Sequence, residues 1–353
     1  MRIIFIFPYP IGEGPSQRFR FEQFYDDLRK REIEYDTQAF FDIKTWRILH
    51  KRGNTIYKLL GVFKGFVRRI KLLTTINQYD WVFIHREAAP IGPPIFEWVI
   101  ARILRKKIIY DFDDAIWLPN VSDSNKFASK LKGYSKVSSI CKWAYRVSCG
   151  NEYLAAYARL RNNNVIIFPT IVNTDVFKPS KDIHQQPITI GWTGSVSTNK
   201  WLEDIESVLQ VVQQKTTCRY LFISNEPPRF KNLKYEFLKW NSSSEVSDIN
   251  QIDIGIMPLP DTEWSKGKCG FKLIQYLSVE KPAVATLVGV NSEIIQEGIT
   301  GFLCKTDDDW IDRLVYLCTH KDIRTNMGKT GRLHIVKYYS KDSQLDTFMC
   351  LFN

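Results

Sequence analysis

The sequence predicts an α/β protein with two doubly wound domains, each built on a parallel sheet. Its 353 residues, 44% of them hydrophobic, exceed the roughly 250–300 residues at which a single core stops growing. Short strands alternate with helices in two successive stretches, which is typical of parallel sheets with right-handed crossovers. The two stretches are separated by a segment containing the helix breakers Pro169, Asn173, Pro179 and Pro187.

We expect a first domain over residues 1–172, a linker over 173–187 and a second domain over 188–340. The first domain has predicted strands at Arg2–Phe7, Tyr35–Ala39, Trp81–His85, Lys107–Tyr110, Arg146–Ser148 and Val165–Phe168, and helices at Phe19–Lys30 and Ile95–Leu104. The second has predicted strands at Ile188–Trp192, Arg219–Ile223, Ile252–Met257, Ala283–Thr286 and Phe302–Cys304, and helices at Leu202–Gln213 and Phe271–Leu277. Further helices are predicted at Asp307–Thr319, Ile323–Tyr339 and Lys341–Phe352.

The composition excludes several classes of protein. No window approaches the roughly 20 apolar residues that a membrane-spanning helix needs. The apolar run Ile3–Phe7 is too short for a secretory signal, and we interpret it as a buried first strand. The seven cysteines contain no C-x-x-C pair, so neither a zinc site nor a disulfide framework is indicated. We therefore expect a protein of the reducing cytoplasm.

The net charge of +11 favours anionic partners. No acidic residue lies between Asp42 and Asp80, and this stretch interleaves bulky apolar residues with Lys44, Arg47, Lys51, Arg52, Lys58, Lys64, Arg68, Arg69 and Lys71. Such a pattern predicts an amphipathic segment on an anionic membrane surface, at the inner face of the cell membrane. Alternatively, the segment is a solvated helix whose apolar side packs on its own domain. Nucleic acid is not an expected partner, because only the net charge favours it and no recognised binding module is present.

Ligands of doubly wound sheets bind at the carboxyl ends of the strands, so the residues after each predicted strand are candidates. After the first strand, a loop with Gly12 and Gly14 leads into a helix that carries Arg18 and Arg20. This loop suits an acceptor or a phosphate, although the arginines are alternatively ordinary surface residues.

Two further candidate clusters follow strands of the first domain. His85, Arg86 and Glu87 come directly at the end of the third strand, before a Gly/Pro turn. The cluster Asp111-Phe112-Asp113-Asp114 follows the fourth strand. Carboxylates this close are tolerated if they bind a metal, meet basic groups or cap a helix.

The second domain offers a site for a diphosphate. Its first strand ends in Gly194 and Ser195, and Lys200 follows. A second glycine- and lysine-rich turn enters a predicted helix through Lys268 and Lys272. Since cations are disfavoured at helix N-termini, lysines placed there indicate a bound anion; alternatively the turn is a solvated basic loop.

These segments resemble the retaining glycosyltransferases of the GT-B fold, specifically glycosyltransferase family 4, over essentially the whole chain. The resemblance is carried by Ile190–Ser195, Gly270–Ala285, Gly298–Leu303 and Gly328–Ser340, of which Gly270–Ala285 is the specific one. His85–Glu87 and Asp111–Leu118 are similar to a subgroup often found in bacterial surface-polysaccharide clusters.

The resemblance implies two Rossmann-like domains that face each other across a cleft, with the nucleotide-sugar in the second domain and the acceptor in the first. The C-terminal helix over 341–353 would pack back on the first domain. The family's ribose-binding glutamate falls on Gln275 and the other glutamate of that motif on Gly267, while a histidine of the acceptor cleft aligns with about Asp113. The expected diphosphate contacts are Gly194, Ser195, Lys200, Lys268 and Lys272, and the expected ribose and base contacts are Gln275, Asn225 and Pro258.

The predicted function is a retaining glycosyltransferase that moves a sugar from a nucleotide-diphosphate sugar to a glycan or lipid-linked acceptor, in polysaccharide biosynthesis. By resemblance, attack occurs on the front face and the departing phosphate takes the acceptor proton. Asp113, Asp114 and His85 would orient the acceptor hydroxyl, and neither a metal nor another cofactor is expected. The expected acceptor-binding residues are Gly12, Gly14, Arg18, Arg20, Arg86 and Glu87.

Two alternatives stay open. Asp111 and Asp113 have the D-x-D form with which another large class of glycosyltransferases holds a divalent ion. The departures at Gly267 and Gln275 also fit a degenerate relative that serves as a non-catalytic scaffold.

Overall fold

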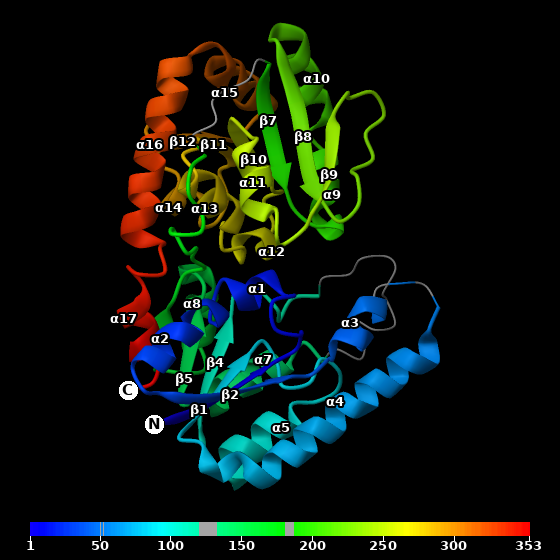
Figure 1. Cartoon of the computed structure of the whole chain (residues 1–353), viewed down its shortest axis with the longest axis vertical. Coiled ribbons are helices and arrows are strands. Elements are labelled where there is room, and N and C mark those ends of the chain that lie inside the picture. The colour runs from blue at the N-terminus through cyan, green and yellow to red at the C-terminus, as the bar shows by residue number, and fades with distance from the viewer. Residues whose placement is uncertain (50, 52, 120–132, 181–186) are drawn as a thin grey trace. The chain divides into compact units, whose positions relative to one another are not determined.

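The computed structural model in Figure 1 describes residues 1–49, 51, 53–119, 133–180 and 187–353. Arg52 of the predicted basic segment and residues 181–186 of the predicted linker lie outside the described residues. The chain divides into two compact units. Unit 1 comprises Met1–Thr170 with Leu345–Asn353, and unit 2 comprises Ile171–Gln344.

Unit 1 is built on a six-stranded parallel sheet in the order β2-β1-β3-β4-β5-β6. Its strands are β1 (Arg2–Phe7), β2 (Glu34–Ala39), β3 (Trp81–His85), β4 (Lys107–Phe112), β5 (Arg146–Cys149) and β6 (Val165–Ile167). The order reverses at β1, because β2 pairs with one edge of β1 and β3 with the other. Ligands of such sheets bind where the order reverses, which in unit 1 is at the carboxyl ends of β1 and β3.

The helices of unit 1 are mostly short. They are α1 (Pro15–Arg18), η1 (Glu22–Phe24), α2 (Tyr25–Lys30), α3 (Ile43–Leu49), α4 (Thr55–Thr75), η2 (Ile76–Gln78), α5 (Ile95–Trp98), η3 (Val99–Ile103), α7 (Lys136–Trp143), α8 (Glu152–Arg159) and α17 (Leu345–Cys350). The predicted helix Phe19–Lys30 is divided between η1 and α2. The predicted helix Ile95–Leu104 begins as α5 and continues as the π-helix η3.

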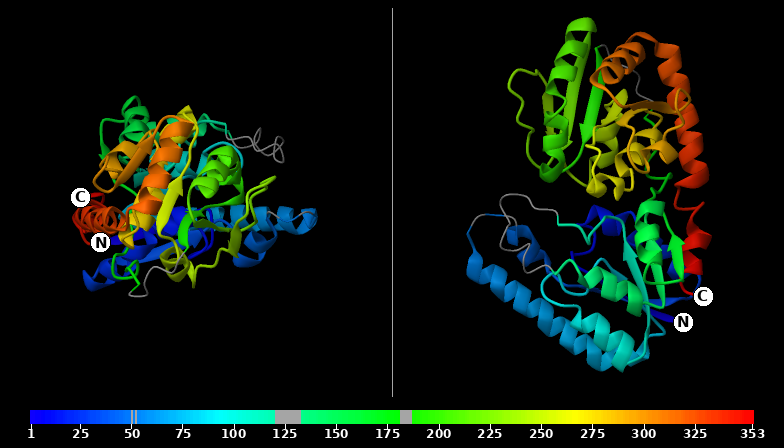
Figure 2. Two further views of the ribbon diagram at one scale, coloured as in Figure 1. Left: turned by 90° about the horizontal axis from the view of Figure 1, so that it is seen from above. Right: turned by 180° about the vertical axis from the view of Figure 1, so that it is seen from behind.

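The C-terminal helix α17 belongs to unit 1, and the end of the chain lies beside its start (Figure 2). The ring of Phe348 stacks on Phe24 with centroids 4.3 Å apart. Phe352 packs its edge against Phe5 in β1, and both side chains are buried. These contacts close the hydrophobic core of unit 1 with residues from the far end of the chain.

Unit 2 repeats the doubly wound plan with the strand order β12-β11-β10-β7-β8-β9. Its strands are β7 (Ile188–Thr193), β8 (Cys218–Ser224), β9 (Glu236–Lys239), β10 (Ile254–Met257), β11 (Ala283–Thr286) and β12 (Gly301–Cys304). Here the order reverses at β7, between β8 and β10. The carboxyl ends of β7 and β10 are therefore the expected ligand position of unit 2.

The helices of unit 2 cover this sheet and include the long α16. They are α9 (Val196–Glu203), α10 (Glu206–Lys215), α11 (Glu245–Asn250), α12 (Glu263–Lys266), α13 (Phe271–Ser278), α14 (Asn291–Ile294), α15 (Asp307–Thr319) and α16 (Lys321–Tyr338). Arg332 of α16 donates to the carbonyl oxygens of Phe177 and Thr174. These bonds fix the residues after Ile171 to unit 2.

The predicted basic segment forms α3 and α4. Gly61 and Gly65 lie on the buried side of α4, where an added Cβ would come within 2.2 Å of Thr45 and 2.5 Å of Phe40. Further along the same side, Arg69 is buried and donates to the carbonyl oxygens of Phe7, Gln38 and Ala88. The glycines allow α4 to pack closely on Thr45 of α3 and on Phe40, which follows β2, and Arg69 ties it to β1, β2 and the turn after β3.

In the part of the chain that the structure describes, no helix is both long enough and apolar enough to cross a bilayer.

Candidate functional site

The carboxyl edge of the unit 2 sheet gathers the residues predicted to bind the donor. Because β8, β7 and β10 are neighbours, the residues that follow them lie along one edge of the sheet. Gly194 and Ser195 follow β7, Asn225 follows β8, and Pro258 follows β10. Asn225 is exposed there, while Pro258 is buried. The predicted donor contacts in these three turns are thus brought together by the strand order.

The turn after β7 is shaped by a glycine and a capped helix. A Cβ on Gly194 would lie 2.2 Å from the indole of Trp192, so only glycine fits without moving that ring. Ser195 and Thr198 form a capping box at the start of α9, which satisfies two of the orphan N–H groups of the first turn. The predicted helix Leu202–Gln213 is in fact two helices, α9 and α10, and α9 begins earlier, directly after this turn.

Trp192 connects the β7 turn to the helix α13. The ammonium group of Lys272 lies over the Trp192 ring, 5.6 Å from its centroid. One turn further along α13, the hydroxyl of Tyr276 accepts a hydrogen bond of 2.9 Å from the backbone N–H of Thr193. Lys272, in the first turn of α13, is therefore held beside the glycine turn of β7.

The other two predicted phosphate-binding lysines lie over different rings. The ammonium group of Lys268 is 5.1 Å from the ring centroid of Trp264, and that of Lys200 is 5.7 Å from the centroid of Trp201. Lys200 sits in the last turn of α9 rather than at its start. Lys272 is thus the lysine whose ammonium group lies over Trp192, the ring beside the Gly194 turn.

Gln275, the predicted ribose contact, is buried in this structure with 2% of its surface exposed. Its amide nitrogen donates to the carboxylate of Glu245 in α11 over 3.1 Å. Ribose hydroxyls would reach Gln275 only if this contact opened. Glu245 was not predicted from the sequence, where it is one acidic residue in a polar stretch.

The strand register of unit 1 aligns three polar side chains on one face of its sheet. His85 is paired with Asp111 across β3 and β4, and Asp111 with Ser148 across β4 and β5. Residues in register on parallel strands point to the same face, so the three side chains meet. The hydroxyl of Ser148 donates to Asp111 over 2.7 Å, and His85 Nδ1 lies 2.7 Å from the other carboxylate oxygen.

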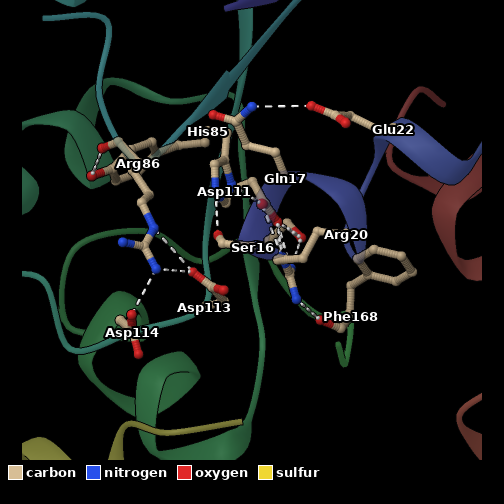
Figure 3. A network of polar contacts seen from close by, with 12 residues as sticks. Ser16, Gln17, Arg20, Glu22, His85, Arg86, Asp111, Asp113, Asp114 and Phe168 are labelled. Carbon is tan, nitrogen blue, oxygen red and sulfur yellow. Dashed lines mark hydrogen bonds and ion pairs between the residues drawn. The ribbon is translucent and has the colours of Figure 1, made fainter. Parts of the chain in front are cut away.

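Arg20 completes this cluster as the counter-ion of Asp111 (Figure 3). Its Nε donates to Asp111 Oδ2 over 2.9 Å, and its Nη1 donates to the carbonyl oxygen of Phe168 over 2.6 Å. Burial raises the pKa of Asp111, but the Arg20 charge and the His85 hydrogen bond outweigh it and lower that pKa to about 2. Arg20 has no exposed surface. The prediction that Arg20 meets the acceptor is therefore corrected, because its guanidinium is enclosed by the cluster.

His85 is likewise inside the protein, with no exposed surface. Its Nε2 lies 2.6 Å from the hydroxyl oxygen of Ser16 in α1, so Ser16 stands where an acceptor hydroxyl was predicted. The loop after β1 is fixed by Gln17, whose side chain bonds the backbone N–H and C=O of Tyr9 and donates to Glu22. Ser16 was not predicted from the sequence, since a single serine carries no distinguishing pattern.

Arg86 carries the second ion-paired cluster. Its φ of +62° is the left-handed conformation, which a non-glycine residue adopts only where its surroundings enforce it. Its guanidinium donates to Asp113 over 2.7 Å and to Asp114 over 2.6 Å. Burial opposes ionisation of Asp113, but the Arg86 charge holds the pKa of that carboxyl far below its ordinary value. These three side chains keep some exposure.

The remaining predicted acceptor residues have different surroundings. Glu87 forms an ion pair of 2.5 Å with Lys136 of α7. Gly12 has a φ of +80° with open space around it, whereas a Cβ on Gly14 would lie 2.9 Å from the Tyr9 ring. The Arg18 guanidinium lies over the Phe19 ring. Of this group, the exposed Gly12 and the half-buried Arg18 and Glu87 retain accessible surface.

Part of the second unit matches a known family model. Residues 187–320 match the family model described as Glycosyl transferases group 1. This group 1 segment covers the strands, turns and lysines of the unit 2 edge.

Curated relatives match over a short stretch. Two trehalose synthases, from Thermococcus litoralis and Pyrococcus furiosus, are each 33% identical over 84 residues. The match covers 24% of this chain and 20% of each relative. It therefore spans about a fifth of the length of these relatives.

Solved structures match over the whole chain. Sucrose-phosphate synthase from Thermosynechococcus elongatus gives a TM-score of 0.72 at 12% identity, covering 100% of this chain and 98% of that one. HepE from Anabaena, in complex with UDP and glucose, gives a TM-score of 0.64 at 13% identity, covering 99% of each chain. These similarities confirm the predicted fold, an α/β protein of the GT-B type with two Rossmann-like sheets.

Proposed function

We propose that this protein is a glycosyltransferase whose unit 2 binds a nucleotide-diphosphate sugar. The observation that carries the proposal is the β7 turn of the group 1 segment, where the Lys272 ammonium group lies over the Trp192 ring and a Cβ on Gly194 would meet the same ring. A backbone turn without a Cβ, the start of a helix and a cation are the features that suit a diphosphate. Because the solved structures of HepE hold UDP and UDP-glucose, uracil is the first base to test.

The chemical task of this site is to stabilise the leaving group. In sugar transfer the barrier lies in expelling the nucleoside diphosphate while the anomeric carbon takes oxocarbenium character. A cation and N–H groups aimed at the diphosphate stabilise the charge that grows there. We assign this role to Lys272 and the turn at Gly194 and Ser195, with Lys268 and Lys200 as further cations of the same segment.

We propose that the reaction needs no metal. The two carboxylates of the D-x-D pattern, Asp111 and Asp113, are each ion-paired with an arginine, Arg20 and Arg86. A divalent ion at this pattern would have to displace two guanidinium groups from largely buried carboxylates. The arginine pairs therefore favour sugar transfer without a metal over the alternative in which the D-x-D pattern holds a divalent ion.

We propose further that transfer retains the anomeric configuration and that unit 1 holds a glycan or lipid-linked acceptor for polysaccharide biosynthesis. The family 4 resemblance supports retention, and NMR of the product anomer tests it. In unit 1, Arg86 with Asp113 and Asp114 provides charged groups that keep a small exposed fraction at the carboxyl edge of its sheet. These groups suit the hydroxyls of a sugar acceptor.

A peripheral position on an anionic membrane is the last part of this proposal. Helix α4 exposes Ile56, Tyr57, Leu59, Leu60, Phe63 and Ile70. The cations Lys64 and Lys71 of the same helix are exposed as well. No acidic residue lies between Asp42 and Asp80. Helix α5 and η3, which lie beside α4 in Figures 1 and 2, add exposed Ile95, Trp98 and Ile103. A basic surface with this much exposed apolar area suits the headgroup region of an anionic bilayer.

The experiment is a screen of UDP-, GDP-, ADP- and TDP-sugars for release of the nucleoside diphosphate. We expect one class of donor to be turned over. Replacing Lys272 with alanine should lower that turnover by about 10²–10³-fold, the effect of losing one charge-stabilising donor, without changing the melting temperature. Lys215→Ala, at the exposed end of α10, is the matched control and should keep full turnover.

Two outcomes would contradict the proposal. Full turnover by Lys272→Ala would remove the phosphate assignment. Failure of every donor, together with no thermal stabilisation by any nucleoside diphosphate, would favour the scaffold alternative, in line with the buried Gln275 and with Gly267 at the position of the family's other glutamate.

A further inference from the structure

Cys218 and Cys318 form a pair of neighbouring thiols in unit 2 that the proposed function does not use. Cys218 is the first residue of β8, and Cys318 lies in the last turn of α15. Both side chains pack against the same hydrophobic core of unit 2, and their thiols are hydrogen-bonded to each other. The fold of unit 2 thus brings together two sulfur atoms that lie far apart in the sequence.

The two cysteines are held by the elements around them. Helices α10 and α15 pack against each other, and Thr216 follows directly after α10. The backbone N–H of Cys218 donates to the carbonyl oxygen of Thr216 over 3.1 Å, and the Thr216 side chain lies beside both thiols. A turn and a helix–helix contact therefore fix the position of the pair.

A buried arginine lies next to the pair. Arg324 of α16 has 2% of its surface exposed, and its Nη1 donates to the carbonyl oxygens of Leu317 over 2.5 Å and Cys318 over 3.4 Å. Within the described residues its Nε has no hydrogen-bond partner. The guanidinium charge interacts with the Cys318 thiol. Because a cation stabilises a thiolate, this part of unit 2 favours a negative charge on the sulfur pair.

The contact between the thiols makes one of them acidic. The hydrogen bond from Cys318 outweighs burial and lowers the pKa of Cys218 to about 6. The same contact, together with burial, raises the pKa of Cys318. By contrast, burial raises the pKa of Cys141 and that of Cys304 to about 12. Since the thiolate is the reactive form of cysteine, Cys218 is the most reactive of these four residues.

The pair also meets the other conditions for oxidation. Cysteines that respond to oxidants combine a low pKa, partial exposure and a second thiol within reach. Cys218 and Cys318 are both half-buried, so small molecules reach them. Proteins of a reducing compartment use such pairs as transient, redox-sensing disulfides rather than as structural ones.

We propose that Cys218 and Cys318 are a redox-sensitive pair that closes to a disulfide when the protein meets a peroxide. The Cys218 thiolate attacks one oxygen of hydrogen peroxide, the O–O bond breaks, and Cys218 becomes a sulfenic acid as hydroxide leaves. That hydroxide takes the Cys318 proton, and the Cys318 thiolate attacks the Cys218 sulfur. The S–S bond forms as the S–O bond breaks, and the second hydroxide takes a proton from the solvent. Two thiols are thus oxidised while one peroxide is reduced to two molecules of water.

The disulfide ties the start of β8 to the end of α15. It closes a loop of about 100 residues, which restricts the unfolded chain and so stabilises the folded unit. A small thiol reverses the reaction by exchange. The pair lies at the amino end of β8, whereas the residues that follow its carboxyl end belong to the proposed donor site. The inference therefore stands independently of the proposed function.

Peptide mapping of the full-length wild type tests the pair without any substrate. After treatment with hydrogen peroxide and alkylation of the remaining thiols, we expect two peptides joined through Cys218 and Cys318, which dithiothreitol separates. Cys350→Ser, which removes an exposed cysteine, is the matched control and should give the same cross-link. Recovery of both Cys218 and Cys318 as alkylated thiols from folded, peroxide-treated protein would overturn the proposal. A cross-link through Cys350 in their place would overturn it as well.

Two single variants test the order of the steps. In Cys318→Ser the serine keeps a hydrogen-bond donor beside Cys218 but cannot form the disulfide, so dimedone should trap Cys218 as the sulfenic acid. In Cys218→Ser, Cys318 should stay reduced at the same peroxide concentration. Trapping of Cys318 instead would overturn the assignment of Cys218 as the attacking thiol.

The melting temperature of the wild type tests the constraint on unit 2. The cross-linked protein should melt at a higher temperature than the reduced protein, and dithiothreitol should restore the lower value. An unchanged melting temperature in fully cross-linked protein would contradict the constraint.

Discussion

At the scale of single residues, the acidic cluster after β4 illustrates how opposite charges make buried carboxylates tolerable. The sequence left three explanations for Asp111, Asp113 and Asp114: a metal, basic partners or a helix cap. The structure pairs Asp111 with Arg20 and the other two with Arg86. Neither arginine is near the cluster in sequence, so the pairing follows from the order of the strands.

Asp111→Asn should strongly destabilise unit 1. The substitution leaves the buried guanidinium of Arg20 without its counter-charge, which typically costs about 3–5 kcal/mol. Denaturant unfolding of the variant and the wild type measures the difference. Asp26→Asn, which removes an exposed pair with Arg29, is the control and should change stability by less than about 1 kcal/mol. Equal effects in the two variants would show that the buried pair contributes no more than an exposed one.

The lowered pKa of Asp111 predicts that the free energy of unfolding depends on pH under acidic conditions. The pKa of Asp111 is lowered from 3.8 to about 2 in the folded protein, so its contribution is complete above about pH 4 and disappears as the pH falls towards 2. That contribution is on the order of 2 kcal/mol. The stability gap between wild type and Asp111→Asn should therefore narrow over this interval. A gap that stays constant from pH 5 to pH 2 would show that the pKa of Asp111 is not lowered.

Gly194→Ala should abolish nucleotide binding while leaving the two units folded. The added methyl group would lie 2.2 Å from Trp192, so the indole must move, and Lys272 rests on that ring. Titration calorimetry with the nucleoside diphosphate of the preferred donor measures the loss. Lys215→Ala, at the exposed end of α10, should bind like the wild type. Unimpaired binding by Gly194→Ala would place the diphosphate elsewhere.

At the scale of elements, the sequence predicted best where a segment has a single strong pattern. The strand Trp81–His85, the strand Ala283–Thr286 and the helix Asp307–Thr319 have the predicted bounds, because each has clear apolar periodicity between turn residues. Strand β9 was missed, since Glu236–Lys239 is short and half polar and lies at the sheet edge. The π-helix η3 was also missed, because apolar residues over Ile95–Leu104 predict a helix without distinguishing a π-helical from an α-helical hydrogen-bond pattern.

Helix α4 shows what pattern alone leaves undecided. Its sequence mixes cations and apolar residues all round, and only packing determines which side is buried. Gly61, Gly65 and Arg69 face the protein, so the exposed side carries Leu59, Leu60 and Phe63 instead. The buried Arg69, predicted as a lipid contact on charge alone, is a structural donor to three carbonyl groups.

The exposed side of α4 should carry the binding of anionic lipid. Replacing Leu59, Leu60 and Phe63 together with serine removes exposed apolar area without altering the buried side, so we expect loss of sedimentation with phosphatidylglycerol vesicles. The wild type should bind phosphatidylcholine vesicles more weakly than phosphatidylglycerol vesicles. Phosphatidylcholine carries no net negative charge with which the cations of α4 could pair. Leu333→Ser, at an exposed leucine of α16, is the matched control. Vesicle binding by the triple variant at the wild-type level would contradict the proposal that this side of α4 binds the membrane.

At the scale of the whole molecule, two sheets of the same plan each place a polar cluster where the strand order reverses. Unit 1 has the Ser16–His85–Asp111 chain after β1 and β3, and unit 2 has the Gly194 turn after β7. The fold class and the turns of unit 2 followed from the sequence, since strand ends and glycine turns are local signals. The partners of Gln275, Arg20 and His85 did not, because they depend on which strands and helices become neighbours.

The most direct test of the central claim is hydrogen–deuterium exchange of the full chain with and without UDP, GDP, ADP and TDP. We predict that one of these nucleotides protects residues 193–198, 257–260 and 267–273, which are the turns at the carboxyl edge of the unit 2 sheet. Protection confined to other segments, or absent with all four nucleotides, would contradict the assignment of this edge as the donor site.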